Sequence, residues 1–185
     1  MRCVRIDGDA AVETGHPDVG ALLRDPVWRS TAAEADGPRH PLAHLDYAPV
    51  VPHPEKVICV GLNYLDHIAE TGRTPPEYPT LFPKFARSLT GANDDIPMPH
   101  DDESTAIDWE AELGVVIGST VCRASGDAAA AAIAGWTVVN DISVRDVQYH
   151  TTQFMPGKAW EASTPVGPHL VVAEAGDEAH FPIEC

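Results

Sequence analysis

The stretch DWEAELGVVIG, residues 108–118, constrains the fold more than any other part of the chain. Polar and apolar residues alternate at its start, and the run then turns apolar, as in a strand that passes from a half-exposed edge into a core. Because successive side chains of a strand point to opposite faces, Glu110 and Glu112 project to the same side, opposite Ala111 and Leu113. The pattern predicts a buried strand that carries two neighbouring carboxylates.

Two interpretations of this carboxylate pair are open. Glutamates at alternate positions are common on solvated strand faces, where they point into water. In a partly enclosed site, however, the two negative charges repel, and the pKa of one carboxyl group rises unless a cation intervenes. Divalent cations such as Mg2+ prefer carboxylate oxygens, so Glu110 and Glu112 are also candidate metal ligands.

Further polar residues follow in the second half of the chain. Asp141 ends the apolar segment WTVVNDIS, and strand ends open into loops where sites are commonly assembled, so a third carboxylate can converge there. Arg145 and Gln148 come next, at helical spacing. Lys158 stands behind a glycine that permits close approach of backbone. Taken singly, each of these charged residues could equally be solvated at the surface.

The segment NYLDHIAETG predicts a short helix with Asn63 as N-cap and Gly72 as the stop. His67 and Glu70 lie three residues apart on it. This spacing lets the Glu70 carboxylate orient the His67 imidazole as a general base. The alternative is that His67 is an ordinary surface residue of the helix.

The remaining apolar runs and turn residues predict a strand-rich chain with a few short helices. VICV, LFPKF and GPHLVVAEA are typical of strands, and GDAAAAAIAG predicts a helix with Asp127 as N-cap and Gly135 as stop. A break in composition near residue 50 divides the chain into an N-terminal subdomain and linker, residues 1–54, and a main domain, residues 55–185.

Charge and composition narrow the possible partners. The net charge of −16, from 28 acidic against 12 basic residues, opposes binding to nucleic acid or to an anionic membrane surface. The sequence opens on no signal peptide and contains no apolar run of the roughly 20 residues that cross a bilayer, so we expect a cytoplasmic protein. The 4 cysteines lie far apart, which favours reduced thiols over a zinc or redox motif.

Several motifs in one order resemble the fumarylacetoacetate hydrolase family, in particular its short members related to acylpyruvate hydrolases. They are GLNYLDHIAE, LFPKFARSLTG, DWEAELGVVIG, GWTVVNDISVRDVQ and GKAWEASTPVGPHLV, which together cover about residues 56 to 173. The resemblance implies an α+β fold, a strand-rich mixed β-sandwich roll with short helices behind a small N-terminal subdomain. It also implies a homodimer.

The resemblance implies a ligand set as well. Glu110, Glu112 and Asp141 match the family positions that hold Mg2+ or Mn2+, and Arg145 and Gln148 match those that contact a small-molecule 2-oxo acid or diketone substrate. On this basis the spaced glutamates are expected to be metal ligands rather than a solvated strand face.

The implied reaction is hydrolysis of a C–C bond in a 2,4-dioxo acid or acylpyruvate-like substrate through a metal-bound enolate. Lys158 would stabilise negative oxygen, and His67, held by Glu70, would activate water. The same scaffold also suits a lyase, such as an oxaloacetate decarboxylase, or a 2-oxo acid hydratase or isomerase.

The family also implies a longer chain. Its members usually continue for roughly a further hundred residues, whereas this sequence stops at AHFPIEC, inside what resembles a strand. We therefore expect a C-terminally incomplete catalytic domain, either a fragment or a shortened product. A non-catalytic truncated homologue that pairs with a full-length relative is a further alternative.

Overall fold

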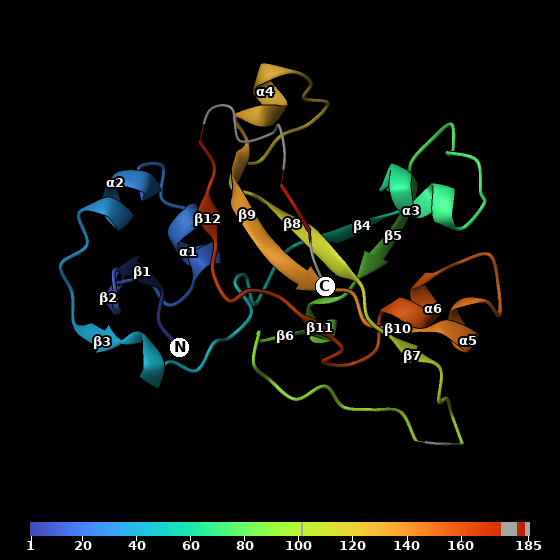
Figure 1. Cartoon of the computed structure of the whole chain (residues 1–185). Helices are drawn as coiled ribbons and strands as arrows, with labels where there is room; N and C mark the ends of the chain where they lie inside the picture. Colours follow the sequence, from blue (N-terminus) through green and yellow to red (C-terminus); the bar gives the residue numbers. More distant parts are fainter. Residues whose placement is uncertain (101, 175–180, 184–185) are drawn as a thin grey trace.

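The computed structural model describes all residues except 101, 175–180 and 184–185. Its described residues form an α+β fold in which short helices lie between small sheets (Figure 1). The first 50 or so residues gather on one side of the molecule. Between them and three short helices lie the two central strands, β8 (Ala111–Ile117) and β9 (Ile133–Asn140). The three helices are α3 (Leu65–Glu70), α5 (Arg145–Gln148) and α6 (Met155–Lys158). Strands dominate, as the sequence patterning predicts.

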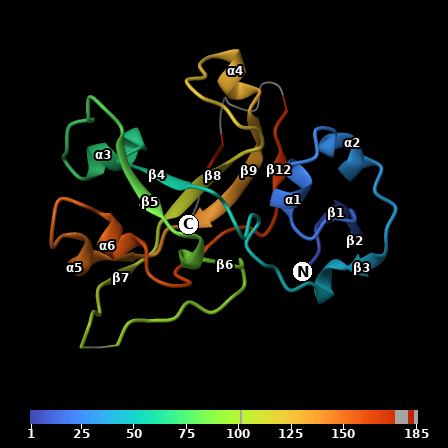
Figure 2. The same ribbon diagram turned by 180° about the vertical axis from the view of Figure 1, so that it is seen from behind.

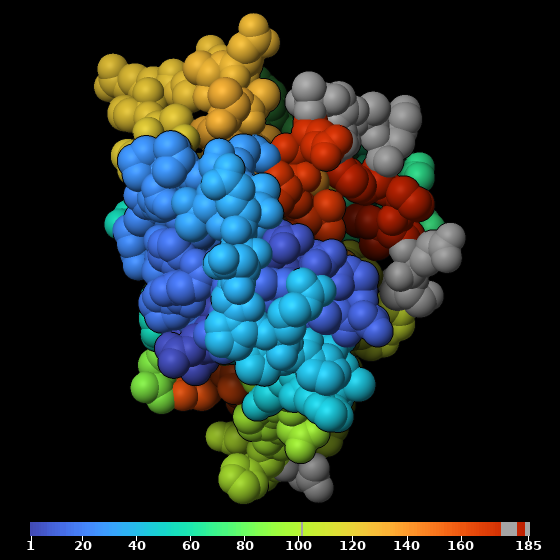
Figure 3. Space-filling model, turned by 90° about the vertical axis from the view of Figure 1, so that its left-hand side faces the viewer, coloured from blue at the N-terminus to red at the C-terminus, as the bar shows by residue number. Residues whose placement is uncertain are grey.

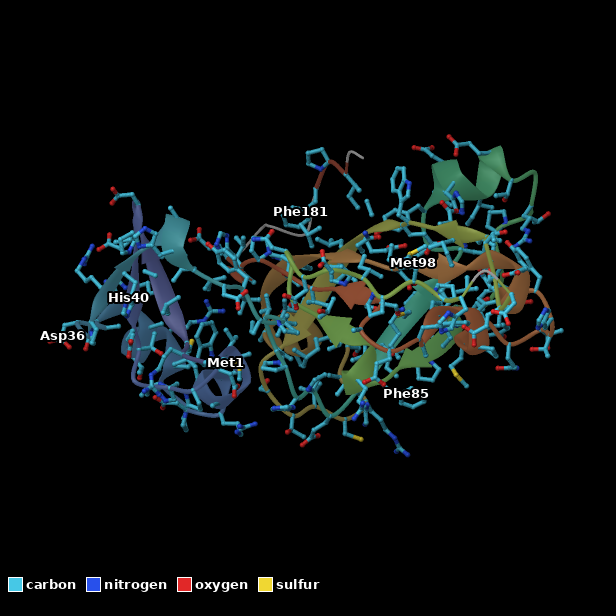
Figure 4. All side chains as sticks on the ribbon, turned by 90° about the horizontal axis from the view of Figure 1, so that it is seen from below. Met1, Asp36, His40, Phe85, Met98 and Phe181 are labelled. Carbon is cyan, nitrogen blue, oxygen red and sulfur yellow. The ribbon has the colours of Figure 1, made fainter. Side chains whose placement is uncertain are left out.

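The N-terminal part is built on an antiparallel three-stranded sheet with the order β1-β2-β3. Its elements are β1 (Val4–Asp7), β2 (Ala10–Glu13), α1 (Val19–Leu23), α2 (Trp28–Ala33), β3 (Arg39–Pro41) and the 3-10 turn η1 (Leu42–His44). The Asp18 side chain caps α1 by accepting a hydrogen bond from the Ala21 amide at 2.7 Å. Figure 3 shows this part covering one face of the molecule, and Figure 4 shows it to one side of the main strands.

The central sheet has the order β12-β9-β8 and carries the carboxylates. Its strands are β8 (Ala111–Ile117), β9 (Ile133–Asn140) and the short β12 (Val171–Val172), all antiparallel to their neighbours. Ala111 pairs with Asn140, and the Asp141 amide donates to the Glu110 carbonyl at 2.9 Å. This register brings the end of β9 beside the start of β8.

A second antiparallel pair, β4 (Val57–Gly61) and β5 (Thr80–Lys84), flanks the central sheet, with α3 (Leu65–Glu70) between its two strands in sequence. On the inner face Phe82 and Lys84 are buried, whereas Ile58, Val60 and Leu81 on the outer face are exposed. The strand predicted over LFPKF is therefore present, and its side chains alternate between buried and exposed.

Small elements complete the main part of the chain. β7 (Ile107–Asp108) pairs with β10 (Ser143–Val144), and β6 (Leu89–Thr90) pairs in parallel with β11 (Thr164–Pro165). The helical elements are η2 (Ala86–Ser88), α4 (Asp127–Ala130), α5 (Arg145–Gln148) and α6 (Met155–Lys158). The β7–β10 pair carries the chain from the central sheet to α5, so the segments that follow Asp141 stay near the start of β8.

The alanine-rich segment differs from its prediction. Only Asp127–Ala130 is helical, its N-cap is Gly126, and β9 already begins at Ile133. A Cβ added at Gly135 would lie 2.1 Å from the Val171 carbonyl oxygen, so this glycine allows β12 to approach β9 and does not stop a helix. Pairing with both neighbouring strands outweighs the helix propensity of alanine here.

The boundaries of other helices and strands also differ from those predicted. The residue that precedes α3 is Tyr64, and no side chain caps the helix, so the prediction of Asn63 as N-cap was wrong. Gly72 does follow the helix end, with φ of 67°. The strand predicted over GPHLVVAEA is limited to Val171–Val172, and only the last residue of that segment, Ala175, lies outside the described residues.

Apolar residues of β9 form part of the core of the main part of the chain. Ala134 and Trp136 on β9 are buried, and the centroid of the Trp136 ring lies 5.1 Å from that of Phe181. Val115 and Val138, by contrast, are exposed on the central sheet. The buried first half of β9 pairs with the second half of β8, so it anchors the central sheet at the end away from Glu110.

Candidate active site

The predicted ligands Glu110 and Asp141 lie around the ammonium group of Lys158. Lys158 Nζ is 2.6 Å from Glu110 Oε2 and 3.2 Å from Asp141 Oδ2. The Lys158 side chain is 3% exposed and that of Asp141 5%, so the contact is removed from bulk water. Strand register places the two carboxylates, and helix α6 supplies the lysine.

Lys84 is a second buried cation on Asp141, and the sequence analysis missed it. Its Nζ lies 2.6 Å from Asp141 Oδ1, donates to Thr164 Oγ1 at 2.8 Å, and also donates to the Lys158 carbonyl. The available signal was a lysine that alternates with Phe82 on one face of an apolar strand. A charged side chain in such a position is retained only when it is paired.

Arg145 extends the cluster toward solvent. Its guanidinium contacts Glu110 Oε1 at 2.8 Å and Asp108 Oδ2 at 2.7 Å, and it donates to Gln148 Oε1 at 3.0 Å. Hydrogen bonding from Arg145 holds the pKa of Asp108 below its ordinary value. Asp108 was not among the predicted site residues, although it opens the same motif as Glu110.

Glu112 lies on the same strand face as Glu110 and is half-buried. Burial raises the pKa of Glu112, and the negative charges of Glu110 and Asp141 raise it further, whereas a hydrogen bond with Tyr64 lowers it. The Tyr64 hydroxyl also accepts a hydrogen bond from the Leu113 amide at 3.3 Å. Within the described part of the chain, no ion pair engages Glu112.

The donor set suits a hard divalent cation. Glu110, Glu112 and Asp141 provide carboxylate oxygens, and the mutual repulsion that raises the pKa of Glu112 is relieved by added positive charge. Their side chains do not converge as a preformed site, since no group of three acidic, histidine or cysteine residues among those described is arranged to hold a metal ion. Lys158 and Arg145 occupy the carboxylate oxygens instead.

His67 and Glu70 are not brought to this cluster. Both are exposed on α3, and no hydrogen bond or ion pair among the described residues joins them to one another or to Glu110. Figure 2 shows α3 apart from α5 and α6. Tyr64, immediately before α3, links this helix to β8 through its hydrogen bond with the Leu113 amide.

A hollow of about 290 Å3 lies beside α3. It is lined by the end of β4, by α3 and by the proline-rich loop that follows, with Val60, Leu62, Leu65 and Ile68 among its apolar residues. His67 does not line it. The hollow offers apolar surface next to the helix rather than next to the charged cluster.

Of the 4 cysteines predicted to be reduced thiols, Cys3, Cys59 and Cys122 are free, and Cys185 lies outside the described residues. Burial, reinforced by the charge of Asp141, raises the pKa of the Cys59 thiol to about 11. None of the helices in the described part of the chain has the length and apolar composition needed to cross a bilayer.

Sequence comparisons relate the chain to known proteins. Residues 56–185 match the family described as fumarylacetoacetate (FAA) hydrolase, C-terminal. The chain is 37% identical over 151 residues to the protein named oxaloacetate tautomerase FAHD2A, mitochondrial, from Homo sapiens, which covers 80% of this chain and 48% of that protein. It is 44% identical over 124 residues to the 2,4-didehydro-3-deoxy-L-rhamnonate hydrolase of a Sphingomonas species, covering 66% and 43% respectively.

Structural comparison points the same way. The crystal structure of a 5-carboxymethyl-2-hydroxymuconate delta-isomerase from Mycobacterium smegmatis superposes with a TM-score of 0.71 at 29% identity, over 94% of this chain and 62% of that one. The chain thus spans about half the length of the curated relatives it matches. The motifs, the fold and the matched relatives agree, and the chain belongs to the fumarylacetoacetate hydrolase family.

Proposed function

We propose that this chain is an enzyme that acts on a 2-oxo acid through an enolate and depends on Mg2+ or Mn2+. Among reactions of that class, tautomerisation of oxaloacetate or a similar 2-oxo dicarboxylic acid suits the geometry best. The observation that carries the proposal is the buried Lys158 ammonium, 2.6 Å from Glu110 and 3.2 Å from Asp141. Enolate chemistry needs a positioned proton donor beside stabilising positive charge, and this cluster contains both.

Glu110, Glu112 and Asp141 would hold the cation. When bound, a divalent cation supplies Lewis-acid polarisation of the substrate oxygens. Arg145 would bind a substrate carboxylate, because its guanidinium is partly exposed and offers planar paired donors, and Gln148 would orient that guanidinium.

Lys158 would move the proton. In the direction from enol to keto form, the enol oxygen loses its proton and the carbon next to the carbonyl gains one. Lys158 gives a proton to that carbon, and the proton released by the enol oxygen restores the ammonium, so no co-substrate is consumed. The low exposure of Lys158 limits exchange of this proton with water.

Hydrolysis of a C–C bond is the second candidate. It needs a water activated by His67 with Glu70, and the observation in its favour is the tether from Tyr64 to β8, which keeps α3 attached beside Glu112. The Sphingomonas relative named as a hydrolase also favours it. Since neither His67 nor Glu70 contacts the cluster, hydrolysis receives less support than tautomerisation.

Product analysis separates these reactions. The purified chain is given enol oxaloacetate and an acylpyruvate, each with and without Mg2+, and the products are followed by proton NMR. Tautomerisation yields the keto form of oxaloacetate alone, decarboxylation yields pyruvate from oxaloacetate, and hydrolysis yields pyruvate and a second carboxylic acid from the acylpyruvate. Absence of all three would contradict the proposal and favour a non-catalytic homologue.

The cellular location and the oligomeric state are two further proposals. We propose a cytoplasmic homodimer, although the human relative carries a mitochondrial name. Exposed apolar residues on the central sheet, such as Val115, Ile117 and Val138, are surfaces that a second copy could cover. Light scattering of the purified chain tests the dimer, and a mass of one chain would exclude it.

A further inference from the structure

The two buried lysines on Asp141 differ in what else they contact. Lys84 Nζ pairs with Asp141 Oδ1 and also donates to Thr164 Oγ1 and to the Lys158 carbonyl, neither of which is a proposed metal ligand. Lys158 Nζ contacts Glu110 Oε2 and Asp141 Oδ2, and both carboxylates are proposed ligands. Lys84 is therefore anchored from outside the cluster, whereas the carboxylates themselves hold Lys158.

A divalent cation and an ammonium group compete for these oxygens. Both are attracted to the same negative charge, and two cations held a few ångströms apart in a site shielded from water repel each other strongly. Lys158 has an alternative position, since its Nζ already lies 5.6 Å from the centre of the Phe82 ring, whose face attracts cations. Arg145 can remain, because it holds the other oxygen of Glu110 and keeps Asp108 as a partner.

We infer that Lys158 is a displaceable internal counter-ion of the carboxylate cluster. Its ammonium neutralises Glu110 and Asp141 until a divalent cation binds, and it then yields their oxygens to that cation, while Lys84 stays in place. Once displaced, the ammonium is no longer paired with either carboxylate, so metal loading frees the proposed proton donor. This inference rests on the proposed metal site. It adds an order of events, in which the metal binds before the proton is transferred.

Calorimetric titration with Mg2+ and with Mn2+ tests the inference without relying on turnover. Lys158→Met removes the competing charge and should bind either metal about tenfold more tightly than the unaltered chain. Lys158→Arg keeps the charge and should bind close to the unaltered chain. Lys56→Met is the matched control, because it removes an exposed lysine charge outside the cluster and should bind metal like the unaltered chain.

The outcomes separate the inference from the proposed function. If the unaltered chain binds metal and Lys158→Met binds it equally or more weakly, the inference is overturned and the metal site stands. If neither binds metal, the metal site and the inference fall together. Should Lys158→Met not fold, the unaltered chain labelled with 15N at lysine Nζ decides: a Lys158 signal that shifts on addition of Mg2+ supports displacement, and an unmoved signal contradicts it.

Discussion

The charged cluster at the start of β8 and the helix α3 hold their motif residues in opposite ways. Glu110, Asp141 and Lys158 are fixed by strand register and by ion pairs shielded from water. His67 and Glu70 are exposed on a six-residue helix without a side-chain cap. The cluster is therefore preorganised for its chemistry, whereas the residues of α3 would have to move to take part.

The largest expected effect is on stability, and it comes from a substitution in the buried charged cluster. Asp141→Asn leaves Lys84 and Lys158 without their shared carboxylate charge, and removing one partner of a buried ion pair costs about 3–5 kcal/mol of unfolding free energy. Urea denaturation measures the loss. Glu70→Gln, on exposed α3, is the control and should change stability by less than about 0.5 kcal/mol. Equal effects of the two substitutions would remove the contrast between the regions.

His67→Ala tests whether α3 takes part in hydrolysis. If this helix activates water, the substitution lowers acylpyruvate hydrolysis by about 100-fold and leaves oxaloacetate tautomerisation within about twofold. Both rates can be followed on one preparation by NMR, with the melting temperature as a check on folding. A parallel fall of both reactions would place His67 in the shared chemistry and weaken the division between cluster and helix.

Tyr64→Phe tests the hydrogen bonds that link α3 to β8. The substitution removes the hydroxyl that accepts from the Leu113 amide and hydrogen bonds with Glu112, at a cost of about 1 kcal/mol. Hydrogen exchange should then increase in α3 while β8 and β9 stay protected. Unchanged exchange in α3 would mean that Tyr64 does not hold this helix.

The smallest expected effect is on thiol labelling, which measures how far burial protects Cys59 from reaction. The raised pKa of Cys59, about 11, means that its reactive thiolate forms only as the pH rises toward that value. Iodoacetamide at pH 8 should therefore label exposed Cys122 and spare Cys59, with Cys59 labelling increasing steeply above pH 10. Mass spectrometry of the peptides reads both sites, and rapid labelling of Cys59 at pH 8 would contradict the enclosed inner face of β4.

Much of this arrangement could be read from local patterns. The alternation in DWEAELGVVIG predicts the strand, and the ends of the apolar runs predict which polar residues lie beside it. The prediction for the alanine-rich segment was wrong because helix propensity is a local property. Gly135 instead allows the close approach of β12, and no local sequence rule reveals that contact.

The site was harder to predict than the strands. Lys84 and Asp141 are 57 positions apart in the sequence and meet only because β5 packs inward, so spacing could not relate them. The sequence also predicted the carboxylates as metal ligands without indicating that Lys158 and Arg145 would pair with them. Charge pairing in a buried site is a property of the packed structure rather than of a motif.

The most direct test follows the disappearance of enol oxaloacetate, by its ultraviolet absorbance, in the presence of Mg2+. The unaltered chain and the surface variant Glu161→Gln should accelerate tautomerisation equally, and Lys158→Met should lose at least about 100-fold of the rate although it retains metal binding. Full activity in Lys158→Met, or no acceleration by the unaltered chain, would contradict the assignment of the cluster as a centre of enolate chemistry.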